Sequence, residues 1–221
     1  MISIRTWAVA AGVALLLMAA LVGFGNFAAI EGLVTWGDAG KTAQDIAASE
    51  GLFRAGVASL FLVVVLDVVI ACALYRVFTP VDRTMSLLAA AFRLVYAAVF
   101  MVALGYLLDA LRHVDQQVLS DVEAFSDLWT AGLGLFGAHL LLLGYLAFRA
   151  SYVPSWLGIL LAIAGLGYLG VFFGQDLTIS TYTFIGELLL AFWLVLRGRR
   201  IPTTFARGFA TADQAEDSRV G

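Results

Sequence analysis

The chain has 221 residues, of which 62% are hydrophobic and 13% charged, and its mean hydropathy is +0.95. Soluble domains carry about 25% charged residues, so this composition excludes an ordinary soluble domain and indicates a protein whose main solvent is lipid. The formal net charge is only −3, and a single cysteine, Cys72, excludes a disulfide within the chain.

Six apolar runs are long enough to cross a bilayer, which takes about 20 residues of helix. In chain order they cover residues 7–30, 52–76, 84–108, 127–149, 155–174 and 178–197. The first run is longer than the apolar core of a signal peptide, so we interpret it as a retained span. Lipid offers no partner to an unpaired backbone amide, so every run must be helical. The sequence therefore predicts an all-α integral membrane bundle of six transmembrane helices over residues 1–200, and a disordered polar tail over 201–221.

Basic residues are unequally distributed between the two ends of these runs. Short loops rich in arginine and lysine stay in the cytoplasm. Most of the basic residues fall at the N-terminus, after even-numbered runs or in the tail: Arg5, Arg76, Arg83, Arg149, Arg197, Arg199, Arg200 and Arg207. The acidic residues concentrate in the other connections. This bias predicts that both termini are cytoplasmic. The apolar composition makes the lipid bilayer the main expected partner. We expect no nucleic acid to bind, and an oligomer remains an open alternative.

Ionisable side chains interrupt four of the six apolar runs at a similar depth. They are Asp67, Arg93, His139 and Glu187, which lie nine or ten residues from Arg76, Arg83, Arg149 and Arg197, respectively. That spacing is about 14–15 Å of helix, half the thickness of a hydrocarbon core of about 30 Å. A charge left alone at this depth costs about 2.5–3.5 kcal/mol. We therefore expect all four to face inward, with Arg93 bridging Asp67 and Glu187, and His139 completing the hydrogen bonds.

A polar stripe leads to this layer along the last run. Asp176, Ser180, Thr183 and Glu187 follow helical spacing, so they share one face of a helix. Ser59 lies two turns from Asp67, and Asn26 lies in the outer half of the first run. These residues suggest a polar crevice that opens outwards and ends at the four ionisable side chains. The alternative is a dry ion-pair network that sets the register of the helices.

Small residues are frequent in the fifth run. They are Gly158, Ala162, Gly165, Gly167, Gly170 and Gly174. Small residues let membrane helices approach closely, so we interpret them as packing positions rather than ligand contacts.

Four sequence blocks carry a resemblance to a known family. They read ASEGLFRAG (48–56), AAFRLVYA (90–97), FGAHLLLLGYLAFR (136–149) and SYVPSWLGILLAIAGLGYL (151–169). In this order and spacing the chain resembles a bacterial membrane family catalogued as domain of unknown function 4386. The resemblance implies a multi-pass protein of the bacterial inner membrane, and it assigns no role to any residue.

Motifs for known chemistry are missing from the sequence. It has no P-loop, Gly-x-Ser-x-Gly or His-Glu-x-x-His pattern, and His139 is the sole histidine within a run, which argues against a two-histidine haem site. His113 and Asp115 alone make a poor metal site, so we predict no metal, no cofactor and no catalytic residue.

Three functional hypotheses remain. The first is a protein that binds or transports a small molecule, ion or proton at Asp67, Arg93, His139 and Glu187. The second is a non-catalytic membrane accessory or stress-response subunit. The third is an intramembrane enzyme that acts on a lipid or quinone, with the carboxylates and histidine as acid and base. It lacks a recognisable nucleophile, so we rank it last.

Overall fold

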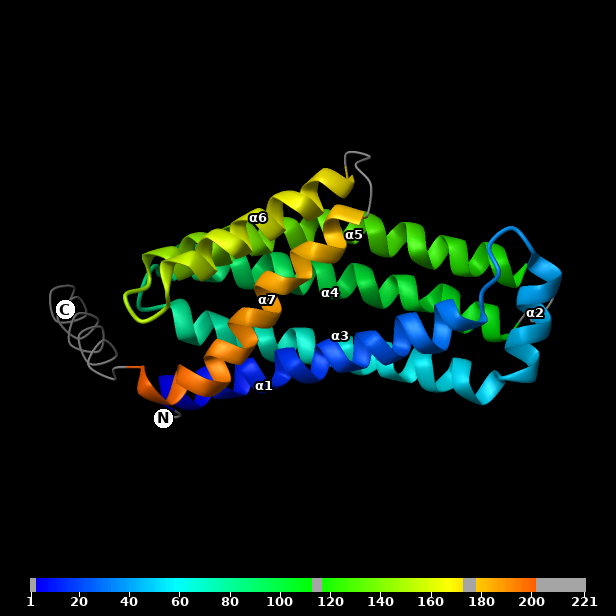
Figure 1. Cartoon of the computed structure of the whole chain (residues 1–221), viewed down its shortest axis with the longest axis horizontal. Coiled ribbons are helices and arrows are strands. Elements are labelled where there is room, and N and C mark those ends of the chain that lie inside the picture. Colours follow the sequence, from blue (N-terminus) through cyan, green and yellow to red (C-terminus); the bar gives the residue numbers. More distant parts are fainter. Residues whose placement is uncertain (1–2, 113–116, 173–177, 202–221) are drawn as a thin grey trace, which may run out of the picture.

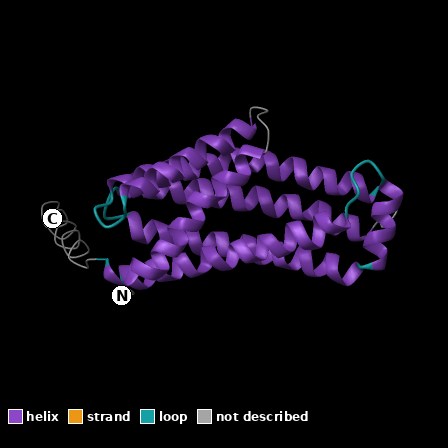
Figure 2. Cartoon of the chain, in the orientation of Figure 1, coloured by secondary structure: helices purple, strands orange, loops and turns teal. Residues whose placement is uncertain are grey.

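The computed structural model describes residues 3–112, 117–172 and 178–201, and within the last helix it describes side chains from residue 185 onwards. Helices and short connections make up these residues, which contain no strand (Figures 1 and 2). The α-helices are α1 (Ile4–Val22), α2 (Ala39–Ala48), α3 (Glu50–Phe78), α4 (Arg83–Arg112), α5 (Val118–Arg149), α6 (Ser155–Phe172) and α7 (Thr178–Arg197). A π-helix, η1 (Gly23–Ile30), and a 3-10 turn, η2 (Glu31–Leu33), extend α1, and a second 3-10 turn, η3 (Gly198–Arg200), follows α7. The predicted all-α fold is confirmed.

Within the described residues, four helical segments are long and apolar enough to cross a membrane. They are Ile4–Leu33, Glu50–Phe78, Arg83–Arg112 and Val118–Arg149, and a shorter apolar helix spans Ser155–Val171. The 29 to 32 residues of α3, α4 and α5 correspond to about 44–48 Å of helix, which exceeds a hydrocarbon core. Helix α5 begins well before the predicted residue 127, because its first turns are polar yet helical. Hydropathy locates the part of a helix that suits lipid, and it does not locate the end of the helix.

The long helices lie side by side and form the body of the bundle (Figure 1). Helix α6 packs along α5, and α7 crosses from α6 to α1. One end of the bundle holds the first turn of α1, the α3–α4 and α5–α6 connections, and η3. We call it the arginine-rich end, since among described residues it carries seven arginines and one acid, Asp82: Arg5, Arg76, Arg83, Arg149, Arg197, Arg199 and Arg200. Ile201, the first residue of the predicted tail, is buried there, and residues 202–221 lie outside the described part.

Helix α2 lies across the opposite end and was not predicted (Figure 1). The Asp38 side chain caps it by accepting a hydrogen bond from the Lys41 amide at 2.8 Å. Thr42 and Ile46, one turn apart, are both buried against the bundle. A ten-residue amphipathic helix is too short and too polar to appear in a search for membrane spans.

Glycines bring α5 and α6 into close contact. A Cβ atom on Gly158 would lie 2.5 Å from the Phe148 amide nitrogen, and one on Gly165 would lie 2.7 Å from the Gly137 carbonyl oxygen. Both neighbours are backbone atoms, so the helices could not accommodate a side chain without moving apart. The predicted packing role of Gly158 and Gly165 is confirmed.

Candidate functional site

The guanidinium group of Arg93 is the centre of a buried polar cluster. Its Nε and Nη2 atoms both lie 2.8 Å from Oδ1 of Asp67, and its Nη1 atom donates to Oε1 of Glu187 at 2.7 Å. Arg93 therefore holds carboxylates from α3 and α7 on two edges of one planar group. An arginine suits this position because its donors are arranged as a rigid fork and it stays charged when buried.

His139 on α5 also contacts the guanidinium, at the Nη1 atom that donates to Glu187. Its Nδ1 atom lies 2.8 Å from the Ala89 carbonyl oxygen, which can only accept, so Nδ1 carries the proton. Its Nε2 atom, 3.2 Å from Nη1 of Arg93, then accepts a hydrogen bond from that group. These two contacts require a neutral imidazole with a single tautomer.

The cluster is almost completely shielded from the exterior of the bundle. The exposed fractions are 0% for Arg93, 1% for Asp67 and His139, and 5% for Glu187. The structure thus brings together, from four helices, the four side chains predicted to share one depth.

Two further residues contact the guanidinium that the sequence pattern did not predict. Nη2 of Arg93 lies 3.4 Å from the sulfur of Met18 on α1, and the guanidinium carbon lies 5.2 Å from the centre of the Phe136 ring on α5. Phe136 precedes His139 by three positions, so helical spacing alone places both on one face. Met18 carries no such signal, since an apolar residue in an apolar run is unremarkable by sequence.

The charges within the cluster do not balance. Asp67 and Glu187 are two carboxylates, whereas Arg93 is the only cation, given that His139 is neutral. In addition, Oδ2 of Asp67 is buried and has no hydrogen-bond partner among the described residues. A buried carboxylate oxygen without a partner destabilises the folded state, because it has lost its hydrogen bonds to water and no hydrogen bond within the protein replaces them.

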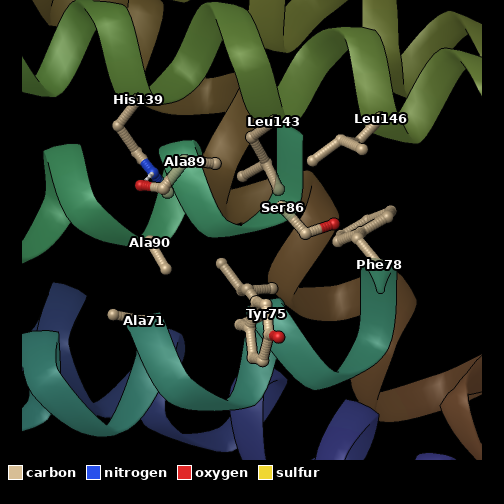
Figure 3. Close-up of a pocket in the computed structure, with 10 residues that line it drawn as sticks. Ala71, Tyr75, Phe78, Ser86, Ala89, Ala90, His139, Leu143 and Leu146 are labelled. Carbon is tan, nitrogen blue, oxygen red and sulfur yellow. Dashed lines mark hydrogen bonds between the residues drawn. The ribbon is translucent and has the colours of Figure 1, made fainter. Parts of the chain in front are cut away.

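Two small cavities adjoin the cluster. The first has a volume of about 10 Å³ and reaches from His139 past Ser86 to Tyr75 and Phe78, towards the arginine-rich end (Figure 3). The second, also about 10 Å³, lies beside Glu187 and Met18. A cavity needs about 10–15 Å³ to hold one water molecule. Neither cavity has room for a ligand larger than water.

Ser86 and Ser59 differ in how their buried hydroxyls are satisfied, which leads to a prediction. The Ser86 hydroxyl has no partner among the described residues, whereas the Ser59 hydroxyl donates to the Leu21 carbonyl at 2.9 Å. We expect Ser86→Ala to leave the free energy of unfolding unchanged or slightly higher, and Ser59→Ala to lower it by about 1 kcal/mol. Thermal unfolding in detergent micelles measures both, and equal losses in the two variants would contradict the assignment.

Of the residues predicted to line a crevice, the structure describes the side chains of Asn26 and Ser59, and neither lines the cavities beside the cluster. The Asn26 side-chain amide donates to the Glu31 carboxylate at 2.7 Å, and the Ser59 hydroxyl donates to the Leu21 carbonyl of α1. Both side chains are buried. Asp176 lies outside the described residues, as do the side chains of Ser180 and Thr183 on α7.

Comparisons with known proteins agree with the resemblance seen in the sequence. The model of a domain of unknown function, DUF4386, matches residues 10–198. An uncharacterized protein of Archaeoglobus fulgidus is 41% identical over 149 residues, which cover 66% of this chain and 85% of the relative. No solved structure matches the chain significantly. A family match over most of the length shows that the chain belongs to the DUF4386 family.

Proposed function

We propose that this chain is a six-span integral membrane protein whose buried cluster binds one proton, as part of proton or cation coupling across the membrane. Four segments long and apolar enough to cross a bilayer support the membrane location. Helices α6 and α7, of 18 and 20 residues, would supply the fifth and sixth spans. The arginine bias favours cytoplasmic termini, and the bacterial inner membrane is the location implied by the family resemblance.

The observation that carries the proposal is the charge imbalance at Arg93. If both carboxylates are ionised, the cluster holds one unneutralised negative charge in a region shielded from water. An uncompensated charge at that depth costs about 2.5–3.5 kcal/mol. Binding of one proton by Asp67 or Glu187 removes this charge and leaves one arginine paired with one carboxylate.

The size of the adjoining cavities favours a proton over a larger ligand. Each is about 10 Å³, which leaves room for a water molecule at most. A small molecule would have to displace side chains of the core. A proton requires no space, and two hydroxyl-bearing residues, Ser86 and Tyr75, line the first cavity (Figure 3), which would suit its passage.

Infrared spectroscopy of the purified protein tests proton binding directly. We expect wild-type protein near neutral pH to show the carbonyl stretch of one protonated, buried carboxyl group. Asp67→Asn or Glu187→Gln should each abolish this band, because each leaves Arg93 with a single ionised partner. Asp109→Asn is the matched control, since the Asp109 carboxylate is 46% exposed and pairs with Arg112 at 3.0 Å.

The same measurement separates this proposal from a static ion-pair network. If both acids stay ionised, wild-type protein shows no such band, and the cluster serves to hold the helices together. Proton flux into liposomes then tests coupling. Flux that survives both Asp67→Asn and Glu187→Gln would remove the cluster from any transport mechanism, whereas a proton bound without flux would favour an accessory subunit.

A further inference from the structure

A second polar site lies at the arginine-rich end of the bundle, away from the cluster. It is a pocket of about 240 Å³ lined by Ser151, Tyr152, Trp193, Arg197, Arg200 and Ile201. Its volume is far larger than that of the two cavities beside Arg93. It can therefore hold a chemical group much larger than a water molecule.

Both walls of this pocket are fixed to the bundle. The Tyr152 hydroxyl, in the α5–α6 connection, donates to the Val77 carbonyl of α3 at 2.6 Å. On the other wall, Arg5 of α1 donates from Nε to the Ile201 carbonyl at 2.9 Å, and Ile201 is buried. Gly198 permits this docking, since a Cβ atom there would lie 3.0 Å from Cβ of Ala8. The pocket is a built feature of the fold rather than a gap between loose chain ends.

The pocket is strongly positive. Arg197 and Arg200 both line it, and neither has an ion-pair partner within the part of the chain that the structure describes. No acidic residue lines it, and Asp82 is the one described acid at this end of the bundle. Guanidinium groups bind phosphate with paired, charge-assisted hydrogen bonds, so two unpaired arginines facing one pocket favour a phosphate group.

The remaining lining residues favour a lipid headgroup as the source of such a phosphate group. Trp193 and Tyr152 combine an apolar ring with a polar edge, which suits the headgroup layer of a bilayer. The pocket lies at the end of α7, where a helix that crosses the membrane would leave the hydrocarbon. Basic pockets between helices at this level bind the headgroups of anionic lipids.

We propose that this pocket binds the phosphate headgroup of one anionic phospholipid, held by Arg197 and Arg200. Trp193 and Tyr152 flank the headgroup at the boundary with the acyl chains. The proposal depends on the membrane location of the chain and is independent of proton binding at Arg93. The infrared experiment and the lipid experiment therefore fail or succeed separately.

Native mass spectrometry of the full chain tests this site. Protein is released from micelles that contain equal amounts of phosphatidylglycerol and phosphatidylcholine, and lipid adducts are counted. We expect wild-type protein to retain one phosphatidylglycerol in preference to phosphatidylcholine. Arg197→Gln/Arg200→Gln should weaken this binding by about 30-fold, the combined effect of two basic residues near an anionic headgroup.

Arg76→Gln/Arg83→Gln is the matched control, because it removes the same charge from exposed positions at the same end but outside the pocket. Equal losses in the two double variants would overturn the site, since they would reveal only a general attraction to positive charge. If the first double variant does not fold, Arg197→Gln and Arg200→Gln are compared singly with Arg76→Gln. Displacement of the lipid by glycerol 3-phosphate at a similar concentration would overturn the lipid source and indicate a soluble phosphate ligand.

Discussion

Replacing Arg93 with methionine is expected to lower the free energy of unfolding by about 3–5 kcal/mol, the usual cost of leaving buried charges without their partner. Arg93 is completely buried, and its removal leaves Asp67 and Glu187 facing each other in the core. Both carboxyls would then have to take up protons or draw water inwards. Equilibrium unfolding in mixed micelles, followed by helical circular dichroism, measures the loss.

A triple variant tests whether this loss comes from charge or from packing. In Asp67→Asn/Arg93→Met/Glu187→Gln the methionine is unchanged but both carboxylates are neutral. We expect it to recover a large part of the stability lost in Arg93→Met, because buried ion pairs replaced as a set are often close to neutral. If the triple variant is as unstable as the single one, the shape of Arg93 matters more than its charge.

Substitution of Gly158 or Gly165 by alanine is expected to lower the free energy of unfolding by about 1–3 kcal/mol each, as overpacking does. The Cβ atoms would meet backbone atoms of α5 at 2.5 and 2.7 Å, so α5 and α6 must separate along their length. The matched control is Gly105→Ala on α4, where a Cβ atom would meet nothing within 4 Å. Alanine is the better helix former, so this control should be neutral or stabilise the protein by up to about 1 kcal/mol. Thermal unfolding of the three variants side by side makes the comparison, and a similar loss at Gly105 would show that glycine is needed for flexibility instead.

Helix α7 takes part in both proposed sites. Glu187 belongs to the cluster at Arg93, and Trp193 and Arg197 line the pocket at the arginine-rich end. The two sites are ten residues apart on one helix, about 15 Å at helical rise. A lipid bound in the pocket would therefore contact the same helix that supplies Glu187 to the cluster.

The sequence by itself determined the fold class, the approximate location of the long helices, and the inward orientation of Asp67, Arg93, His139 and Glu187. Each of these follows from local physics. Lipid allows only hydrogen-bonded helices, helical rise converts residue number into depth, and the cost of a lone charge requires the four side chains to face inward. The close packing at Gly158 and Gly165 was also predictable, because small residues are the usual contact points of membrane helices.

Only the tertiary structure decided what each polar group contacts. Asn26 and Ser59 were predicted to line a polar crevice, yet both side chains form hydrogen bonds with neighbouring protein groups. Three other contacts join segments far apart in sequence. Met18 contacts Arg93, Arg5 donates to the Ile201 carbonyl, and the pocket at Arg197 and Arg200 is completed by the α5–α6 connection. Spacing along a helix specifies depth and face, but the partner depends on how helices rotate and cross, which is set by the packing of the whole bundle.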